Sequence, residues 1–172
     1  MTAIYLRALE PEDYKTSIKW RKDDATWALL GGIKRYVSEA CEKKWVEDAI
    51  FAKGDIKLAV CTVDSDLLIG YVYLNKVDFT QRSAVIGCLI GDVNFRGKGC
   101  GREAMRQLLV YAFSELGLHR ISAYILESNI PSQKAVQKLG FKKEGLLRDS
   151  VFKGGAWQNQ VIFAVLDSEF IS

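Results

Sequence analysis

The sequence has little of what metal sites and disulfide frameworks need. Its 172 residues include one histidine, His119, and four cysteines, which are widely and irregularly spaced without a Cys-x-x-Cys pair. Zinc sites take closely spaced Cys and His ligands, and disulfide frameworks use paired cysteines. We therefore expect no metal cofactor and no disulfide framework. Cys61 and Cys88 lie in strand-like runs and predict small core residues, and His119 predicts a structural hydrogen bond.

Long apolar runs and a strong charge of one sign are also lacking. The apolar run at residues 67–74 is far shorter than the roughly 20 residues that span a bilayer. Residues 1–11 lack the basic start and the long apolar segment of a signal peptide. The net charge of +3 is too small to predict nucleic-acid binding. We expect a cytoplasmic protein that binds neither membranes nor nucleic acids.

What is present is an ordinary globular composition, with 49% hydrophobic and 26% charged residues. No repeat or linker divides the chain, so residues 1–172 predict one domain with a proper core. The order of strand-like and helical patterns predicts an α/β fold with a mixed sheet and helices on both faces. The expected strands are residues 4–9, 56–63, 67–75, 83–92, 120–126, 148–153 and 156–166, with further strand structure that begins at Phe141. The expected helices follow Pro11 and Ser38, span residues 103–116 and open at Pro131, and residues 27–36 are expected to be irregular.

The most informative segment is residues 96–102, Arg-Gly-Lys-Gly-Cys-Gly-Arg, between a strand-like run and an amphipathic helical run. Alternate glycines let the backbone approach a ligand and turn its N–H groups toward one point. The positive end of the following helix and the basic side chains favour an anion there. The turn therefore predicts a phosphate site that best fits a pyrophosphate, the alternative being a glycine-rich turn without a ligand. Its glycines are Gly97, Gly99 and Gly101, and its basic residues are Arg96, Lys98 and Arg102.

Two common phosphate motifs do not match this turn. A P-loop ends in Gly-Lys-Ser/Thr, whereas Gly101 is followed by Arg102 and Glu103. A dinucleotide fingerprint needs Gly-x-Gly-x-x-Gly and an acid about 20 residues later, and neither is found. The sequence therefore supports neither a Mg²⁺-dependent nucleotide hydrolase nor a dehydrogenase.

A second polar pair, Asn129 and Ser132, lies between the predicted strand at residues 120–126 and the helix that opens at Pro131. An Asn side chain offers a donor and an acceptor, which suits the amides of an extended ligand. The same two residues could equally cap and begin the helix. Both interpretations remain open on the residues alone.

Together, the two segments resemble the GNAT superfamily of N-acetyltransferases. Residues 96–101 match its pyrophosphate motif, Gln/Arg-x-x-Gly-x-Gly/Ala, and residues 129–141 match its next block, which ends in Lys-Leu-Gly-Phe. Residues 6–13, 144–148 and 155–166 look like the ribosomal-protein-alanine and spermidine acetyltransferase branches. The resemblance covers nearly the whole chain. It implies a mostly antiparallel sheet of about seven strands flanked by helices, with strands that part at the cofactor cleft.

The resemblance also implies acetyl-CoA as co-substrate and direct attack by a primary amine in a ternary complex. The strand before the turn would bond the pantetheine arm, and the backbone N–H of Ile90 or Leu89 would stabilise the oxyanion. Asn129 would bond the pantetheine beside Ser132, and Lys134 would reach a phosphate or be a solvated helix residue. The implied cofactor-binding residues are Leu89, Ile90, Gly91, Arg96, Gly97, Lys98, Gly99, Cys100, Gly101, Arg102, Asn129, Ser132 and Lys134.

Two positions depart from the family pattern. Val136 stands where many relatives have a Tyr that protonates the thiolate, which leaves Ser132 as the nearest protic side chain. Val85 stands where relatives often have a Glu that deprotonates the amine, a step the amine needs because its pKa lies near 10. Asp92 is the base we name in its place, with Asp24 and Glu127 as other candidates.

The acceptor stays open between a protein N-terminus, a polyamine, an amino sugar and a small amine. The first helices and the last hairpin would form its pocket, with Trp20, Arg21 and Trp27 among the contributors, and Arg21 would favour an anionic acceptor. Because the two usual catalytic residues are missing, the alternative is a non-catalytic acyl-CoA-binding sensor. Dimers are common in the family, so the resemblance also implies a homodimer.

Overall fold

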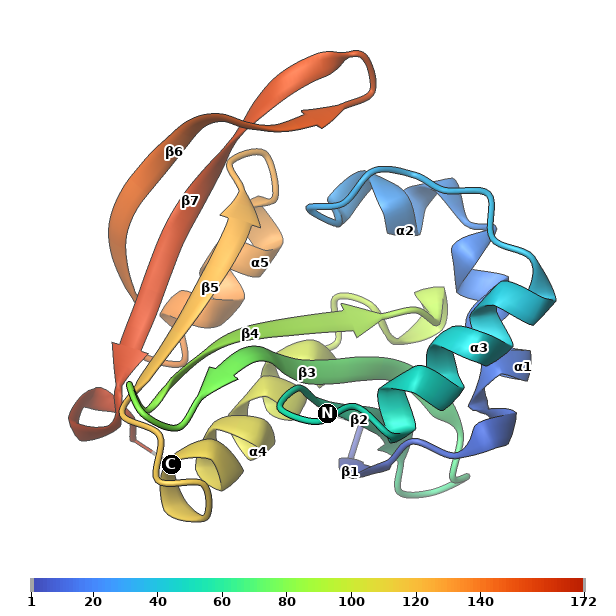
Figure 1. Ribbon diagram of the computed structural model, residues 1–172, viewed down its shortest axis with the longest axis horizontal. Coiled ribbons are helices and arrows are strands. Elements are labelled where there is room, and N and C mark those ends of the chain that lie inside the picture. The colour runs from blue at the N-terminus through green and yellow to red at the C-terminus, as the bar shows by residue number, and fades with distance from the viewer. Residues whose placement is uncertain (1, 172) are drawn as a thin grey trace.

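The computed structural model describes residues 2–171, which form one seven-stranded sheet with helices on both faces (Figure 1). The strand order is β1-β2-β3-β4-β5-β7-β6. Neighbouring strands are antiparallel except for β4 and β5, which are parallel. The expected mixed and mostly antiparallel sheet is therefore confirmed.

The element bounds follow the sequence pattern closely. The strands are β1 Ile4–Ala8, β2 Ile56–Thr62, β3 Leu68–Asp78, β4 Ser83–Ile90, β5 Arg120–Leu126, β6 Lys142–Lys153 and β7 Ala156–Leu166. The helices are α1 Tyr14–Arg21, α2 Asp24–Leu29, α3 Glu39–Ile50, α4 Cys100–Ser114 and α5 Ile130–Gln137, with short 3-10 turns η1 Pro11–Asp13, η2 Val93–Phe95 and η3 Asp167–Glu169. The expected strand at residues 148–153 is the end of the longer β6.

Two helix predictions need correction. The segment expected to be irregular, residues 27–36, begins inside α2, because Asp23 caps that helix by accepting hydrogen bonds from the N–H groups of Ala25 and Thr26 at 3.1 Å. Helix α4 begins at Cys100, three residues before the expected start at Glu103, because Gly99 adopts a left-handed conformation (φ +86°) that leads directly into the helix.

The two sheet faces carry separate cores. Helices α4 and α5 cover one face, where Leu108 and Leu109 are fully buried. Helices α1 and α3 cover the other face, where Trp20 packs edge-on against Tyr71 with ring centroids 5.3 Å apart. Burying each large side chain stabilises the fold by about 1.5–3 kcal/mol. The helices therefore hold the sheet rigidly from both sides.

The sequence predictions for Cys61, Cys88 and His119 are confirmed. Cys61 is fully buried and Cys88 packs against the core from a partly buried position. The His119 ring forms a hydrogen bond with Asp167 at 2.9 Å, joining the start of β5 to the end of β7. Within residues 2–171, no helix has the length and apolar character needed to cross a membrane.

Strands β4 and β5 part soon after they begin. They pair only where residues 83–85 face residues 120–122, and then they diverge (Figure 1). The β5-facing edge of β4 is therefore unpaired from residue 86 to residue 90. This opening positions the candidate site.

Candidate active site

A cleft of about 680 Å³ occupies the opening between the parted strands. One wall is β4 from residue 86 to residue 90, and the other is β5 from residue 123 to residue 126. The loop before α4 and the start of α5 also line the cleft. Three further lining residues are Thr26 of α2, Leu30, which follows α2, and Tyr73 of β3. The cleft is thus large enough for an extended ligand and is formed by segments far apart in the sequence.

The main chain of β4 presents polar groups to this cleft. Gly91 donates its N–H to the carbonyl oxygen of Ile69 at 2.9 Å, toward β3. Because N–H groups alternate in direction along a strand, the N–H of Leu89 also points to β3, and that of Ile90 points to the open edge. Of the two expected oxyanion donors, the geometry therefore favours Ile90.

The glycine turn ends in an open helix N-terminus. Gly97 and Gly99 have positive φ angles of +72° and +86°, which L side chains rarely adopt. The first α4 bond runs from the N–H of Glu103 to the carbonyl oxygen of Gly99 at 3.0 Å. The N–H groups of residues 100–102 consequently have no acceptor within the helix, and they lie at the positive end of its dipole.

Not every residue of the turn contributes as expected. A Cβ at Gly101 would meet Ile90 Cγ1 at 3.4 Å and Cys88 Sγ at 3.6 Å, which are ordinary contacts, so the backbone requires only the first two glycines. Cys100 is buried, and only its main chain can serve a ligand. Lys98, Arg102 and Lys134 line the cleft and bring positive charge to it.

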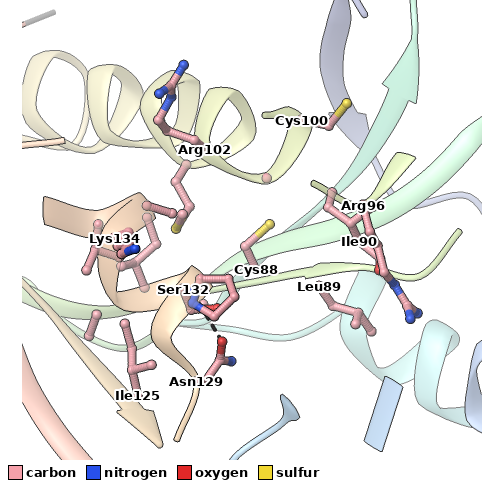
Figure 2. Close-up of a pocket in the computed structure, with 18 of the residues that line it drawn as sticks. Cys88, Leu89, Ile90, Arg96, Cys100, Arg102, Ile125, Asn129, Ser132 and Lys134 are labelled. Carbon is pink, nitrogen blue, oxygen red and sulfur yellow. Dashed lines mark hydrogen bonds between the residues drawn. The ribbon is translucent and has the colours of Figure 1, made fainter. Parts of the chain in front are cut away.

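The Arg96 side chain lines the cleft, and neighbouring protein groups accept its hydrogen bonds. Its guanidinium donates to the carbonyl oxygens of Ile90 and Gly91, each at 2.9 Å, and to Thr26 Oγ1 at 2.5 Å. It also contacts Asp23 Oδ2 at 3.2 Å. In Figure 2 it extends past Ile90, away from Cys100 at the start of α4. These hydrogen bonds join β4 to α2, and phosphate binding by Arg96 stays a prediction.

Asn129 and Ser132 form the helix cap that the sequence allowed. Asn129 is buried, and its Oδ1 accepts a hydrogen bond from the N–H of Ser132 at 3.2 Å, which caps α5 (Figure 2). Both residues also line the cleft. The capping interpretation is confirmed, and binding by the same residues stays a prediction.

The candidate bases lie outside the residues that line the cleft. The carboxylate of Asp92 caps η2 by accepting from the N–H of Asn94 at 2.9 Å, because the chain turns at the end of β4. Asp24 pairs with Lys34, and Glu127 accepts from the Asn159 side chain at 2.8 Å. Asp92 is therefore not placed as the base that the sequence suggested.

The two departures from the family pattern have structural counterparts. Val136 lines the cleft but is buried in the core, and Val85 faces Asn75 and Ser122 across its neighbouring strands. Burial raises the pKa of the cleft-lining Cys88 thiol to about 12, and it also raises the pKa of Tyr73. Both side chains therefore stay protonated at neutral pH.

The residues of α1 and α2 that were expected to bind the amine acceptor make contacts within the protein. Trp20 and Trp27 are buried, and Arg21 donates to the carboxylate of buried Glu42 at 2.8 Å. The Arg21 guanidinium also lies 4.9 Å from the centre of the Trp45 ring. Arg21 is therefore committed to an internal ion pair, which corrects the expectation that it would favour an anionic acceptor.

Lys138 and Thr26 are among the lining residues that sequence reasoning missed. Lys138 follows Lys134 by four residues, and helical spacing would have placed both on one face. Thr26 follows Asp23 by three residues, a spacing typical of a helix cap. Among residues 2–171 no group of three metal-binding side chains is found.

Comparisons with known proteins agree with this geometry. The family model described as Acetyltransferase (GNAT) domain matches residues 3–142. The Bacillus subtilis protein named Uncharacterized N-acetyltransferase YnaD is 29% identical over 151 residues, which cover 80% of this chain and 88% of that protein. The spermidine N(1)-acetyltransferase of Vibrio cholerae is 30% identical over 105 residues, which cover 61% of this chain and 60% of that enzyme. A solved structure of spermidine N-acetyltransferase from Vibrio cholerae in complex with CoA and spermine has a TM-score of 0.89 at 24% identity and covers 98% of both chains.

The parted strands beside a glycine turn are the arrangement that the resemblance to the acyl-CoA-dependent acyltransferases implied. With the family match over residues 3–142, the chain belongs to the GNAT family of acetyltransferases. It is an N-acetyltransferase whose co-substrate is acetyl-CoA, as the resemblance implied.

Proposed function

We propose that this enzyme transfers an acetyl group directly to a primary amine while both substrates occupy the β4–β5 cleft. The carrying observation is the unpaired edge of β4, which leads to the open N-terminus of α4. This arrangement fits an extended thioester that carries a pyrophosphate, because alternate main-chain N–H groups of β4 face the cleft and the N-terminus of α4 favours an anion.

Different residues along the cleft would bind different parts of acetyl-CoA. The N–H groups of residues 97–102 would bind the pyrophosphate, and Lys98, Arg102 and Lys134 would add positive charge. The unpaired β4 edge at residues 86–90 and the Asn129 side chain would hold the pantetheine. Acetyl-CoA supplies an activated acyl group, so the reaction forms a carbon–nitrogen bond and breaks the carbon–sulfur bond. The Ile90 N–H would stabilise the developing oxyanion. Ser132 would supply a proton to the departing sulfur, and the proton that the attacking nitrogen releases balances the one that Ser132 gives up.

An acetyl-CoA turnover screen tests this function. The panel contains a peptide with a free N-terminus, spermidine, glucosamine and a small alkylamine, and CoA release is measured for each. Amine-dependent release supports the proposal. Binding of acetyl-CoA without release across the panel would instead favour the sensor alternative, which none of the comparisons supports.

Replacing Ser132 with alanine should lower kcat about 10- to 100-fold and leave the KM for acetyl-CoA nearly unchanged. The reason is loss of a proton donor, an effect softened because a thiolate is a tolerable leaving group. Steady-state kinetics measure both constants. Ser128→Ala is the control, because Ser128 precedes α5 and lies outside the cleft lining. A kcat for Ser132→Ala equal to that of the wild type would remove Ser132 from the mechanism.

Further expectations stay predictions. We propose that residues 1–172 form a single N-acetyltransferase domain that works in the cytoplasm and binds neither nucleic acid nor membrane. We also propose a homodimer that uses the C-terminal strands, which is supported by the position of β6 at the edge of the sheet.

A further inference from the structure

Arg96 joins the end of β4 to the start of α2, two segments that border the cleft. It is the first residue of the turn that precedes α4, yet its guanidinium lies between the end of β4 and the start of α2. Two of its acceptors are the carbonyl oxygens of Ile90 and Gly91, at the end of the strand that carries the proposed oxyanion donor. The other two acceptors belong to Thr26 and Asp23, which form the N-terminal cap of α2.

The cap of α2 is built around this contact. Asp23 Oδ2 accepts from the Thr26 hydroxyl at 2.6 Å and from its N–H at 3.1 Å, and Arg96 then donates to both side chains. The Thr26 hydroxyl, Arg96 and two main-chain N–H groups lower the pKa of Asp23, with Thr26 the largest cause. The carboxylate is therefore ionised at neutral pH and suited to a guanidinium partner.

Helix α2 depends on such contacts for its position. It contains six residues, and a helix this short is not stable by itself. The Trp27 indole N–H donates to the carbonyl oxygen of Arg21 at 2.8 Å, which ties α2 to α1. At the other end, Lys153 of the β6–β7 hairpin donates to the carbonyl oxygens of Trp27 and Leu30. Figure 1 shows α2 opposite this hairpin, across the opening above β4.

The position of α2 sets one wall of the cleft. Thr26, Leu30 and Gly31 line the cleft together with Tyr73. Because the turn and the start of α4 would take the pyrophosphate, this wall is left for the acceptor. A residue that fixes α2 on β4 therefore acts on the acceptor half through Thr26.

We propose that Arg96 is a positioning residue that docks α2 onto the end of β4 and thereby shapes the acceptor half of the cleft. The assignment of this half to the acceptor rests on the proposed transfer reaction. The docking itself rests on four contacts of one guanidinium with two β4 carbonyl groups and the α2 cap. A competing assignment is that Arg96 serves as a phosphate ligand of the turn that it begins.

Hydrogen exchange of α2 amides tests the docking without an acceptor. Thr26→Val removes the hydroxyl that joins Asp23 to Arg96 while keeping the shape of the side chain, and Thr26→Ser keeps the hydroxyl. We expect α2 to exchange at least ten-fold faster in Thr26→Val and in Arg96→Lys, and at the wild-type rate in Thr26→Ser. Ser38→Ala, which removes the cap of α3, is the matched control and should speed exchange in α3 only.

Binding and kinetics separate the two assignments. CoA titrated calorimetrically into Thr26→Val should bind within about three-fold of wild type, because the turn is untouched. With an amine identified by the turnover screen, the acceptor KM should rise about ten-fold in Thr26→Val, with a smaller change in kcat. Thr26→Ser should restore the wild-type acceptor KM.

Several outcomes would overturn the proposal. Wild-type exchange of α2 in both Thr26→Val and Arg96→Lys would show that Arg96 does not dock this helix. Weak CoA binding by Arg96→Lys with normal α2 exchange would assign Arg96 to the phosphate. An unchanged acceptor KM in Thr26→Val would show that α2 does not shape the acceptor half. If no amine is acetylated, the proposed reaction fails, and α2 exchange with CoA affinity still decides the docking.

Discussion

Replacing Gly99 with valine should weaken CoA binding at least about 100-fold. Gly99 has φ +86° at the N-cap of α4, and a β-branched residue is strained in this region. The chain would leave the left-handed conformation, and the N–H groups of the turn would no longer point to one place. Losing two hydrogen bonds to a charged phosphate costs about 3–6 kcal/mol, which corresponds to the expected loss. Isothermal titration with CoA measures it.

Gly117→Val is the matched control for this prediction. Gly117 also has a positive φ, +63°, and a Cβ there meets no atom within 4 Å. It follows α4 at the opposite end of the helix and does not line the cleft. Both variants should lose similar stability from backbone strain, and only Gly99→Val should lose CoA affinity. Tight CoA binding by a folded Gly99→Val protein would show that the amides of this turn do not hold the pyrophosphate.

The parts of the fold that the sequence predicted best are those determined by neighbouring residues. The α4 pattern repeats with the period of a helix over fifteen residues, and a glycine turn precedes it. The β2–β3 hairpin and the β6–β7 hairpin likewise join alternating strands through short polar or glycine turns. Such signals are strong because the residues that form the element also specify it.

Helix α2 and the direction of Arg96 could not be predicted in this way. Arg96 contacts Asp23 and Thr26, which lie 73 and 70 residues earlier in the chain. No local pattern specifies that pairing. A helix of six residues is also too short for its pattern of apolar residues to be recognised. A basic residue beside a glycine turn is reasonably expected to face a phosphate, and only the tertiary structure shows that this one contacts the cap of α2.

The catalytic half of the site shows a different limit. The sequence could show that Val85 and Val136 replace the usual acidic and phenolic residues, but it could not show what takes their place. Asp92 was named as a candidate base, and its carboxylate caps η2. The catalytic group that we propose beside the thioester is a main-chain N–H. The direction of such a group depends on strand pairing and not on residue type.

The main-chain donor can be removed directly. An amide-to-ester replacement at residue 90, made by semisynthesis, exchanges the Ile90 N–H for an oxygen and keeps the side chain. If this N–H stabilises the oxyanion, kcat should fall about 100- to 1000-fold, the usual loss for one such donor. The acetyl-CoA KM should change little, because the interaction forms mainly in the transition state. Steady-state kinetics with an amine from the turnover screen measure both constants.

The same replacement at residue 89 is the control that strand geometry supplies. The N–H of Leu89 points toward β3, so its loss removes a sheet hydrogen bond and should lower stability by about 0.5–1.5 kcal/mol. Its kcat should stay near the wild-type value once the protein is folded. Equal losses of kcat at residues 89 and 90 would mean that the ester disturbs β4 as a whole. A large loss at residue 90 alone would mean that the direction of one N–H in the parted strand determines the rate.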